Sequence, residues 1–342
     1  MKRIIVCCDG TWELPYRREE ELSAPTNVAK IAELIAPGDE RGVGQFCLYQ
    51  DGTADLPDET EEASLGTVIT HCIQTGYRFI ASRFSEGDEI WLFGFSRGAY
   101  IARSIIGMIH NSGLLRPEEL DKLSLAYELY RNRYPETHPD SGYSAGFRDT
   151  FSVPAAVKFL GVWDTVGHGG IPRSILAGHP SNSWCFHSLN LSSIVENAYH
   201  AVAIDERRPD YAPCLWESGP ATKGEQVLFP GVHSDVGGGY HEAGLSDCAL
   251  AWMVCKARGC GLGFAPGKLC LAPDPHGVLH DLRQRELPEG EVERRTFRGS
   301  ALSLSAQARK ESPEYEPENL PETPLTQCCK NRGECANFFK CH

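Results

Sequence analysis

Long apolar runs are missing from this sequence of 342 residues. The N-terminus carries positive charge at Lys2 and Arg3, and only five apolar residues follow, Ile4–Cys8. A secretory signal needs roughly 7–15 apolar residues, and a membrane-spanning helix needs about 20. No segment of the sequence reaches either length. The sequence therefore predicts a cytoplasmic protein without a transmembrane segment.

Runs of Lys or Arg are also missing. The chain has 33 Lys and Arg against 46 Asp and Glu, which gives a formal net charge of −13. This excess of negative charge disfavours binding to nucleic-acid phosphates and docking on anionic membranes. We therefore expect no nucleic-acid partner, whereas a neutral or zwitterionic lipid is compatible with this charge as a substrate.

Cysteine pairs of the Cys-x-x-Cys kind, which are typical of zinc sites, do not occur among the 14 Cys. Thiols in a chain without a secretion signal are expected to be free rather than linked in a disulfide framework. The cysteines closest to the C-terminus, Cys328 to Cys341, indicate an exposed, oxidisable tail. The sequence predicts neither a metal nor a cofactor.

Short apolar runs alternate with longer amphipathic segments over the first 110 residues, and the same order resumes later. Strands are expected at Arg3–Cys8, Gln45–Tyr49, Glu89–Phe95, Ala156–Trp163 and Gln226–Val232, with helices at Asn27–Ile35, Ser64–Phe84, Ala99–Ile109 and Leu245–Lys256. This alternation predicts an α/β fold with a doubly wound, mostly parallel sheet that is covered on both faces.

Two segments do not fit the strand–helix alternation and are expected to form a lid over the site. The first, about 117–149, begins with a helix at Glu118–Tyr134 and continues as a loop, and the second is about 167–188. We expect one catalytic domain over residues 1–260. Residues 261–342 are expected to form a partly loop-like C-terminal extension that ends in the Cys-rich tail.

A Gly-x-Ser-x-Gly pattern around Ser96 is the most informative motif. Ser96 stands where a predicted strand ends and a predicted helix begins, the setting of a nucleophile elbow. Gly94 and Gly98 fit this interpretation because side chains two residues away would collide with the strained turn. The alternative is a serine that only caps the helix.

An acid and a base are needed to activate such a serine, and in α/β-hydrolases they follow it in that order, each just after a strand. Asp164 follows the predicted strand that ends at Trp163, and His233 follows the strand that ends at Val232. The predicted catalytic triad is therefore Ser96, Asp164 and His233.

Two backbone N–H groups should stabilise the oxyanion that forms in acyl transfer. We expect them to be the amides of Arg97, directly after the nucleophile, and of Thr11, in the loop after the first strand. Asp9, Gly10, Gly94, Gly98 and Asp235 are expected to order the surrounding loops, although Asp9 could instead pair with a metal.

Other acids and histidines are weaker candidates for the triad. Asp205 and Asp210 lie in or beside the charged stretch Asp205-Glu206-Arg207-Arg208, where salt bridges are the expected role. His187 lies in the second insertion, and His200 in an expected helix. His241, after a run of glycines, is the nearest competitor to His233 as the base.

Five motifs in this order resemble the uncharacterised α/β-hydrolase domain family of type VI secretion phospholipase effectors and their fungal relatives. They are Asp9-Gly10-Thr11-Trp12, Gly94-Phe95-Ser96-Arg97-Gly98-Ala99, Val162-Trp163-Asp164-Thr165-Val166-Gly167, Asp205-Glu206-Arg207-Arg208 and Gly231-Val232-His233-Ser234-Asp235-Val236-Gly237-Gly238-Gly239-Tyr240. The resemblance covers roughly residues 1–260. It implies a serine hydrolase that uses the triad named above on phospholipid acyl esters.

The expected function is hydrolysis of carboxylic esters through an acyl-serine intermediate, with a lipid-like or phospholipid substrate. Two alternatives stay open at this point. One is an esterase or thioesterase that acts on a small soluble substrate, and the other is a non-catalytic binding module that has the same fold.

Overall fold

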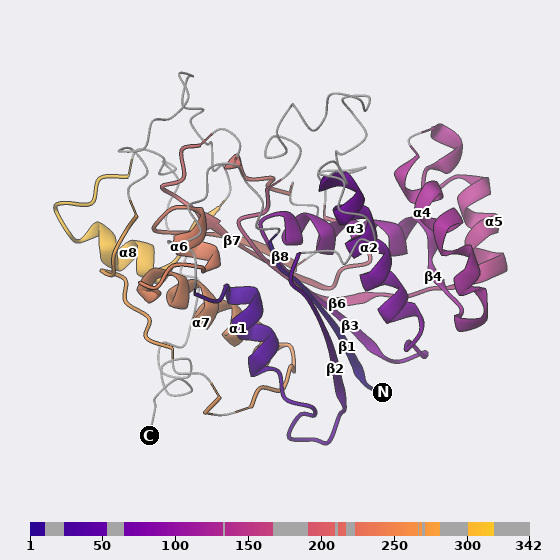
Figure 1. Ribbon diagram of the computed structural model, residues 1–342, viewed down its shortest axis with the longest axis horizontal. Coiled ribbons are helices and arrows are strands. Elements are labelled where there is room, and N and C mark those ends of the chain that lie inside the picture. Colours follow the sequence, from indigo (N-terminus) through magenta and orange to yellow (C-terminus); the bar gives the residue numbers. More distant parts are fainter. Residues whose placement is uncertain are drawn as a thin grey trace.

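The computed structural model describes residues 1–10, 24–52, 65–132, 134–166, 191–208, 211–216, 223–265, 267–268, 271–280 and 300–317. In this part of the chain, a parallel sheet of seven strands forms the centre of the molecule (Figure 1). Its order is β2-β1-β3-β6-β7-β8-β9. The strands are β1 Arg3–Cys8, β2 Gln45–Gln50, β3 Glu89–Phe95, β6 Val157–Trp163, β7 Asn197–Ala203, β8 Lys223–Phe229 and β9 Ala301–Leu302. The predicted fold class is confirmed.

Helices cover both faces of this sheet (Figure 1). One apolar core joins the sheet to α2 Leu65–Ala81, α3 Arg97–Ser112 and α4 Leu123–Arg131. A second core joins the other face to α1 Asn27–Leu34 and α7 Gly244–Gly259. Side chains from central strands alternate between the two cores, Ile4 and Val6 on one face and Ile5 and Cys7 on the other, which explains their continuous apolar sequence.

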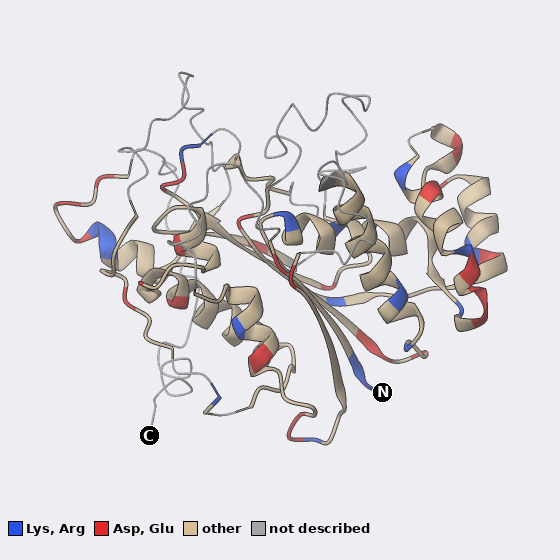
Figure 2. Ribbon diagram, in the orientation of Figure 1, with Lys and Arg blue, Asp and Glu red and all other residues tan. Residues whose placement is uncertain are grey.

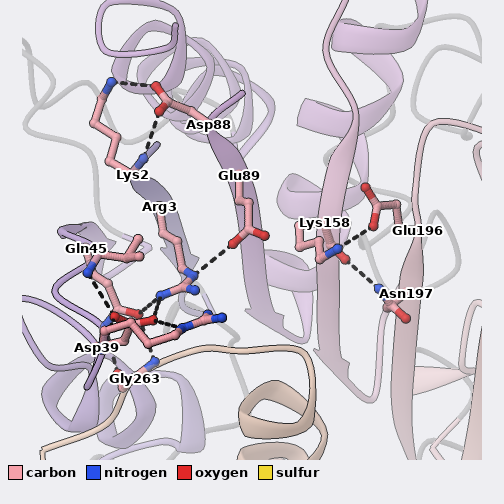
Figure 3. A network of polar contacts seen from close by, with 12 residues as sticks. Lys2, Arg3, Asp39, Gln45, Asp88, Glu89, Lys158, Glu196, Asn197 and Gly263 are labelled. Carbon is pink, nitrogen blue, oxygen red and sulfur yellow. Dashed lines mark hydrogen bonds and ion pairs between the residues drawn. The ribbon is translucent and has the colours of Figure 1, made fainter. Parts of the chain in front are cut away.

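Polar side chains, several of them buried, connect the amino ends of several strands (Figure 3). The Arg3 side chain is only 1% exposed and donates hydrogen bonds to Asp39 at 2.9 Å and to Glu89 at 2.8 Å. Lys2 pairs with Asp88, and Lys158 pairs with Glu196 at 2.7 Å. These contacts fix the starts of β1, β3 and β6, so that the carboxyl ends of the same strands are aligned at the opposite edge of the sheet.

The segment 117–149 packs on the second half of α3. It contains the 3-10 helices η2 Pro117–Lys122 and η3 Pro135–Thr137 with α4, and it leads into α5 Gly142–Phe151. Ser112 donates a hydrogen bond to the carbonyl of Ala126, and Arg148 donates one to the carbonyl of Asn111. Both hydrogen bonds lie at the C-terminal end of α3, whereas Ser96 precedes its N-terminal end. The other predicted lid segment, 167–188, falls outside the described residues, and the lid stays a prediction.

Three local expectations differ from the structure. His200 lies on β7 and not on a helix, because Asn197–Ala203 pairs with β6 and β8. The loop expected after Tyr134 contains α5, whose first turn is capped by Ser141 and whose Phe147 is buried. No strand was expected at β4 Leu114–Leu115 or β5 Ser152–Val153, which pair with each other outside the main sheet. Beyond residue 260, the two-residue strand β9 pairs with β8. In each case the packing of the whole fold decided what the local pattern left unclear.

The C-terminal part of the described chain adds one further helix, α8 Leu304–Lys310, next to β9. Basic residues are dispersed among acidic ones along the ribbon (Figure 2). Among the described residues, no helix is long and apolar enough to span a membrane.

Candidate active site

Ser96 occupies a strained turn between β3 and α3. Its backbone has φ 58° and ψ −123°, which side-chain-bearing residues rarely adopt. A Cβ on Gly94 would lie 2.5 Å from the carbonyl oxygen of Gly98, and a Cβ on Gly98 would lie 2.1 Å from that of Cys8. The glycines of the motif are therefore required by the close approach of backbone on both sides of the serine.

The side chain of Ser96 does not cap α3, although the residue stands at its N-cap position. This geometry disfavours the alternative in which the serine is only a capping residue. Arg97 is the first residue of α3, so its amide lies at the positive end of the helix dipole. A Cβ on Gly10 would lie 3.4 Å from the Cβ of Ser96, which places the loop after β1 against the serine. Thr11, the second predicted oxyanion donor, lies outside the described residues.

Asp164 and His233 form a direct buried pair. Their side chains are 0% and 1% exposed, and the Nδ1 of His233 is 2.6 Å from the Oδ2 of Asp164. The other oxygen of Asp164 accepts a hydrogen bond from the amide of Ala203 at 3.1 Å. Asp164 also has a positive φ of 32°, so the chain turns sharply after β6 to present this carboxylate. His233 is the first residue of α6 His233–Gly237.

The second ring nitrogen of His233, Nε2, is buried and has no hydrogen-bond partner in the described part of the chain. The imidazole packs between Phe95, at 4.6 Å between ring centroids, and Tyr211, at 4.8 Å. Burial lowers the pKa of His233, while the hydrogen bond to Asp164 and its negative charge oppose this effect. A neutral imidazole with a free ring nitrogen is what a general base requires.

Backbone hydrogen bonds hold Ser96 close to the turn that carries Asp164. Its amide donates to the carbonyl of Trp163 at 3.1 Å, and its carbonyl accepts from Val166 at 3.3 Å, one residue before and two after Asp164. Phe95, which precedes the serine, is the residue that packs on His233. The structure thus gathers Ser96, Asp164 and His233 at the carboxyl edge of the sheet.

Asp9 and Asp235 order the loops around these residues. Asp9 accepts hydrogen bonds from the amide of Gly10 at 2.7 Å and from the hydroxyls of Thr26 and Tyr49. Burial raises the pKa of Asp9, and these three donors oppose the effect. Asp235 accepts from the amide of Val232 at 3.0 Å, directly before His233. Within the described residues, no group of three or more His, Cys, Asp or Glu could hold a metal ion.

The rival residues lie elsewhere or have other partners. His241 is exposed, and His200 is fully buried with its Nε2 accepting the amide of Thr165 at 3.1 Å. Asp205 accepts hydrogen bonds from the amide of Gly231 and the hydroxyl of Tyr315. His187 and Asp210 lie outside the described residues.

Sequence reasoning missed three residues near the base. Glu206 is fully buried and accepts a hydrogen bond from the His233 amide at 3.1 Å. Arg208 pairs with Glu206 at 2.8 Å, and His280 pairs with Asp235 at 2.6 Å. The charged stretch from Asp205 to Arg208 was a signal for the first two. A cluster of charged residues is ordinarily exposed to solvent. Only the position of β7 in the sheet shows that Glu206, which follows this strand, is buried.

This chain is similar to a known protein family and to a yeast protein. A family model described as "T6SS, Phospholipase effector Tle1-like, catalytic domain" matches residues 2–256. The uncharacterised protein YEL023C of Saccharomyces cerevisiae is 33% identical over 231 residues, which is 60% of this chain and 31% of that protein.

Two solved structures are also similar. One is an uncharacterised protein from Pseudomonas aeruginosa, with TM-score 0.41 and 17% identity over 77% of this chain and 46% of that one. The other is the Tle1 effector bound to the VgrG spike of the type 6 secretion system, with TM-score 0.40 and 19% identity over 71% and 52%. The chain thus spans about a third of the yeast relative and about half of each solved chain.

Proposed function

Because the chain belongs to the family of Tle1-like catalytic domains of type VI secretion phospholipase effectors, we propose that it hydrolyses lipid carboxylic esters through an acyl-serine intermediate. The observation that carries this proposal is the buried pair of Asp164 and His233. The Nε2 of His233 has no hydrogen-bond partner among the described residues, and its ring packs on Phe95, directly before the strained turn of Ser96. A reactive serine needs this combination of a sharp turn that presents its hydroxyl, a neutral base and an acid partner.

In the proposed mechanism, the oxygen of Ser96 attacks the ester carbonyl while Nε2 of His233 takes its proton. Asp164 stabilises the imidazolium that forms and fixes the tautomer that leaves Nε2 free. The amides of Arg97 and Thr11 donate to the oxyanion. His233 then returns the proton to the leaving alcohol, and water, activated by the same base, releases the fatty acid from Ser96.

A phospholipid acyl ester is the favoured substrate because the family model describes phospholipase effectors. The catalytic unit in this proposal covers residues 1–260, within which all five motifs lie. Soluble small esters and thioesters form the second candidate class, which the net charge of −13 slightly favours. No cofactor takes part in either reaction.

The first experiment is labelling with a fluorophosphonate probe, which reacts with activated serines. The folded wild-type protein should be labelled at Ser96, and S96A should not. Absence of labelling in folded wild-type protein would favour a non-catalytic binding module. Release of fatty acid from phosphatidylcholine vesicles, compared with release from a monomeric short-chain ester, then separates the two substrate classes.

His233→Ala and His241→Ala are matched variants for the base. We expect His233→Ala to abolish turnover and His241→Ala to retain most of it. The reverse result would show that the proposed triad has the wrong base.

A further inference from the structure

Glu206 is a buried carboxylate with an unusual number of donors. Its side chain is fully buried, and it follows β7, the strand next to the one that carries Asp164. Its Oε1 accepts from the amides of Arg207 and Arg208 at 3.0 and 2.9 Å, and its Oε2 accepts from the amide of His233 at 3.1 Å. The carboxylate of Glu206 therefore contacts the backbone of His233, the proposed base, directly.

Arg208 extends the contact to the imidazole ring. Its guanidinium donates to both oxygens of Glu206, at 2.9 and 2.8 Å, and lies 3.6 Å above the ring of Tyr211. The Tyr211 ring meets the His233 ring edge-on, at 4.8 Å between centroids. Glu206 thus reaches His233 by two routes, one through the backbone amide and one through Arg208 and Tyr211.

Asp205 supports the same loop from its other side. It accepts a hydrogen bond from the amide of Gly231 at 2.7 Å, and its own amide donates to the carbonyl of Gly231 at 3.0 Å. A Cβ on Gly231 would lie 2.3 Å from the Cβ of Asp235, so a residue with a side chain does not fit at this position. Neighbouring acids, Asp205 and Glu206, therefore clamp the loop at positions 231 and 233.

We propose that Glu206 and Arg208 form a positioning pair for His233, which sets the orientation of the imidazole and balances the charge around it. The inference rests on the proposed function, in which His233 is the base. It gives a role to the charged motif from Asp205 to Arg208 that the triad leaves unused. Neither residue is assigned a contact with substrate.

The members of the pair act on the proton affinity of His233 in opposite directions. The charged and titratable groups that face the imidazole are Asp164 from β6, with Glu206, Arg208 and Tyr211 from the segment after β7. The negative charge of Glu206 raises the pKa of His233, and the positive charge of Arg208 lowers it. Removing either charge should therefore unmask the effect of the other.

The test compares E206Q, R208Q and R208K with the wild type. In E206Q the acid limb of the kcat/KM profile should move to lower pH, and in R208Q it should move to higher pH, each by roughly half a unit or more. Loss of orientation should lower kcat by about 10²-fold in E206Q and leave KM within a few-fold, since Glu206 does not contact substrate. R208K keeps the charge and should leave the pH profile in place.

The matched control is Glu225→Gln on the neighbouring strand β8, which breaks an ion pair with Lys256 of α7. It should change neither the pH profile nor kcat. Thermal unfolding of every variant checks that the fold is retained. If E206Q fails to fold, R208Q and R208K still decide the question, because the direction of the R208Q shift and its absence in R208K are expected only from a charge that acts on His233.

Titration of the His233 imidazole by ¹⁵N NMR separates this inference from the proposed function. Opposite shifts in E206Q and R208Q would support the pair even if wild-type protein hydrolysed no ester. Shifts in the same direction, or no shift in either variant, would overturn it even if S96A abolished esterase activity.

Discussion

Polar groups are buried at both ends of the sheet, but the two ends differ in backbone strain and in how fully these groups are hydrogen-bonded. At the amino end, Arg3 has acidic and amide partners for its buried side chain, and the neighbouring lysines have acidic partners (Figure 3). At the carboxyl end, Ser96 and Asp164 have positive φ angles, and the Nε2 of His233 has no hydrogen-bond partner among the described residues. Satisfied polar groups hold a structure together, whereas strain and an unused acceptor are features expected of a reactive site.

This difference indicates a division of roles along each strand. The amino end fixes the register and spacing of β1, β3 and β6, and the carboxyl end receives three functional side chains in a defined arrangement. A change at the amino end should therefore lower stability more than activity, and a change at the carboxyl end should do the reverse. The first two predictions below test this contrast.

The largest expected effect is the loss of activity in Asp164→Asn. An asparagine can hold His233 in the wrong tautomer, so kcat should fall by up to roughly 10⁴-fold while the fold is retained. The same change at the amino end, Asp88→Asn, removes a partner of Lys2 and should leave kcat unchanged. Steady-state kinetics and circular dichroism on both variants provide the measurement. Equal losses of kcat would refute the division of roles.

The second prediction concerns stability at the amino end. Arg3→Met leaves the carboxylates of Asp39 and Glu89 without their buried cation, and should lower the melting temperature by roughly 5 °C or more. Arg41 also pairs with Asp39, but its side chain is 69% exposed, so Arg41→Met serves as the matched control and should change the melting temperature little. Activity per folded molecule should be unchanged in both. A large fall in kcat for Arg3→Met would contradict the contrast.

The third prediction tests the backbone of the serine turn. In Gly98→Ala the new methyl group would overlap the carbonyl oxygens of Cys8 and Asp9, at 2.1 and 2.5 Å. We expect a destabilisation of about 1–3 kcal/mol, with reduced labelling at Ser96 as the turn shifts. Gly259, at the end of α7, has open space around its Cβ position, so Gly259→Ala should be nearly neutral. Urea unfolding of both variants measures the difference.

Much of this arrangement could be predicted from the sequence because it depends on local patterns. The apolar runs of β1, β3 and β6 predict buried parallel strands, and the Gly-x-Ser-x-Gly motif predicts the turn at Ser96. Asp164 and His233 were chosen because each follows a predicted strand, and the structure brings their side chains into contact. Their place in a triad stays a prediction. These features need only a few consecutive residues to be recognised.

Other features depend on the whole fold and leave little local signal. Strand β7 contains three alanines and a histidine, a composition that does not distinguish strand from helix. Strand β9 has only two residues. The burial of Glu206 follows from its place at the end of β7, so the error in that strand also hid the pair it forms with Arg208. Burial of a charged residue is a property of tertiary structure that its neighbours in sequence do not reveal.

The last prediction concerns the acid dependence of stability that comes from His200. Burial and the positive charge of Arg103 lower the pKa of His200 to about 3, whereas a histidine in the unfolded chain has a pKa near 6.5. Above that value neither state binds the proton, so the full stability is present. As the pH falls below about 6.5, the unfolded chain takes up a proton that folded His200 does not, and the free energy of unfolding should fall by roughly 1.4 kcal/mol per pH unit for this one group.

His200→Gln keeps an acceptor for the amide of Thr165 but cannot titrate, so its stability should depend less steeply on pH between about 6.5 and 4. The exposed His276→Gln is the control and should retain the wild-type slope. Urea unfolding at several pH values measures these slopes, and an unchanged slope in His200→Gln would show that His200 is not the group responsible.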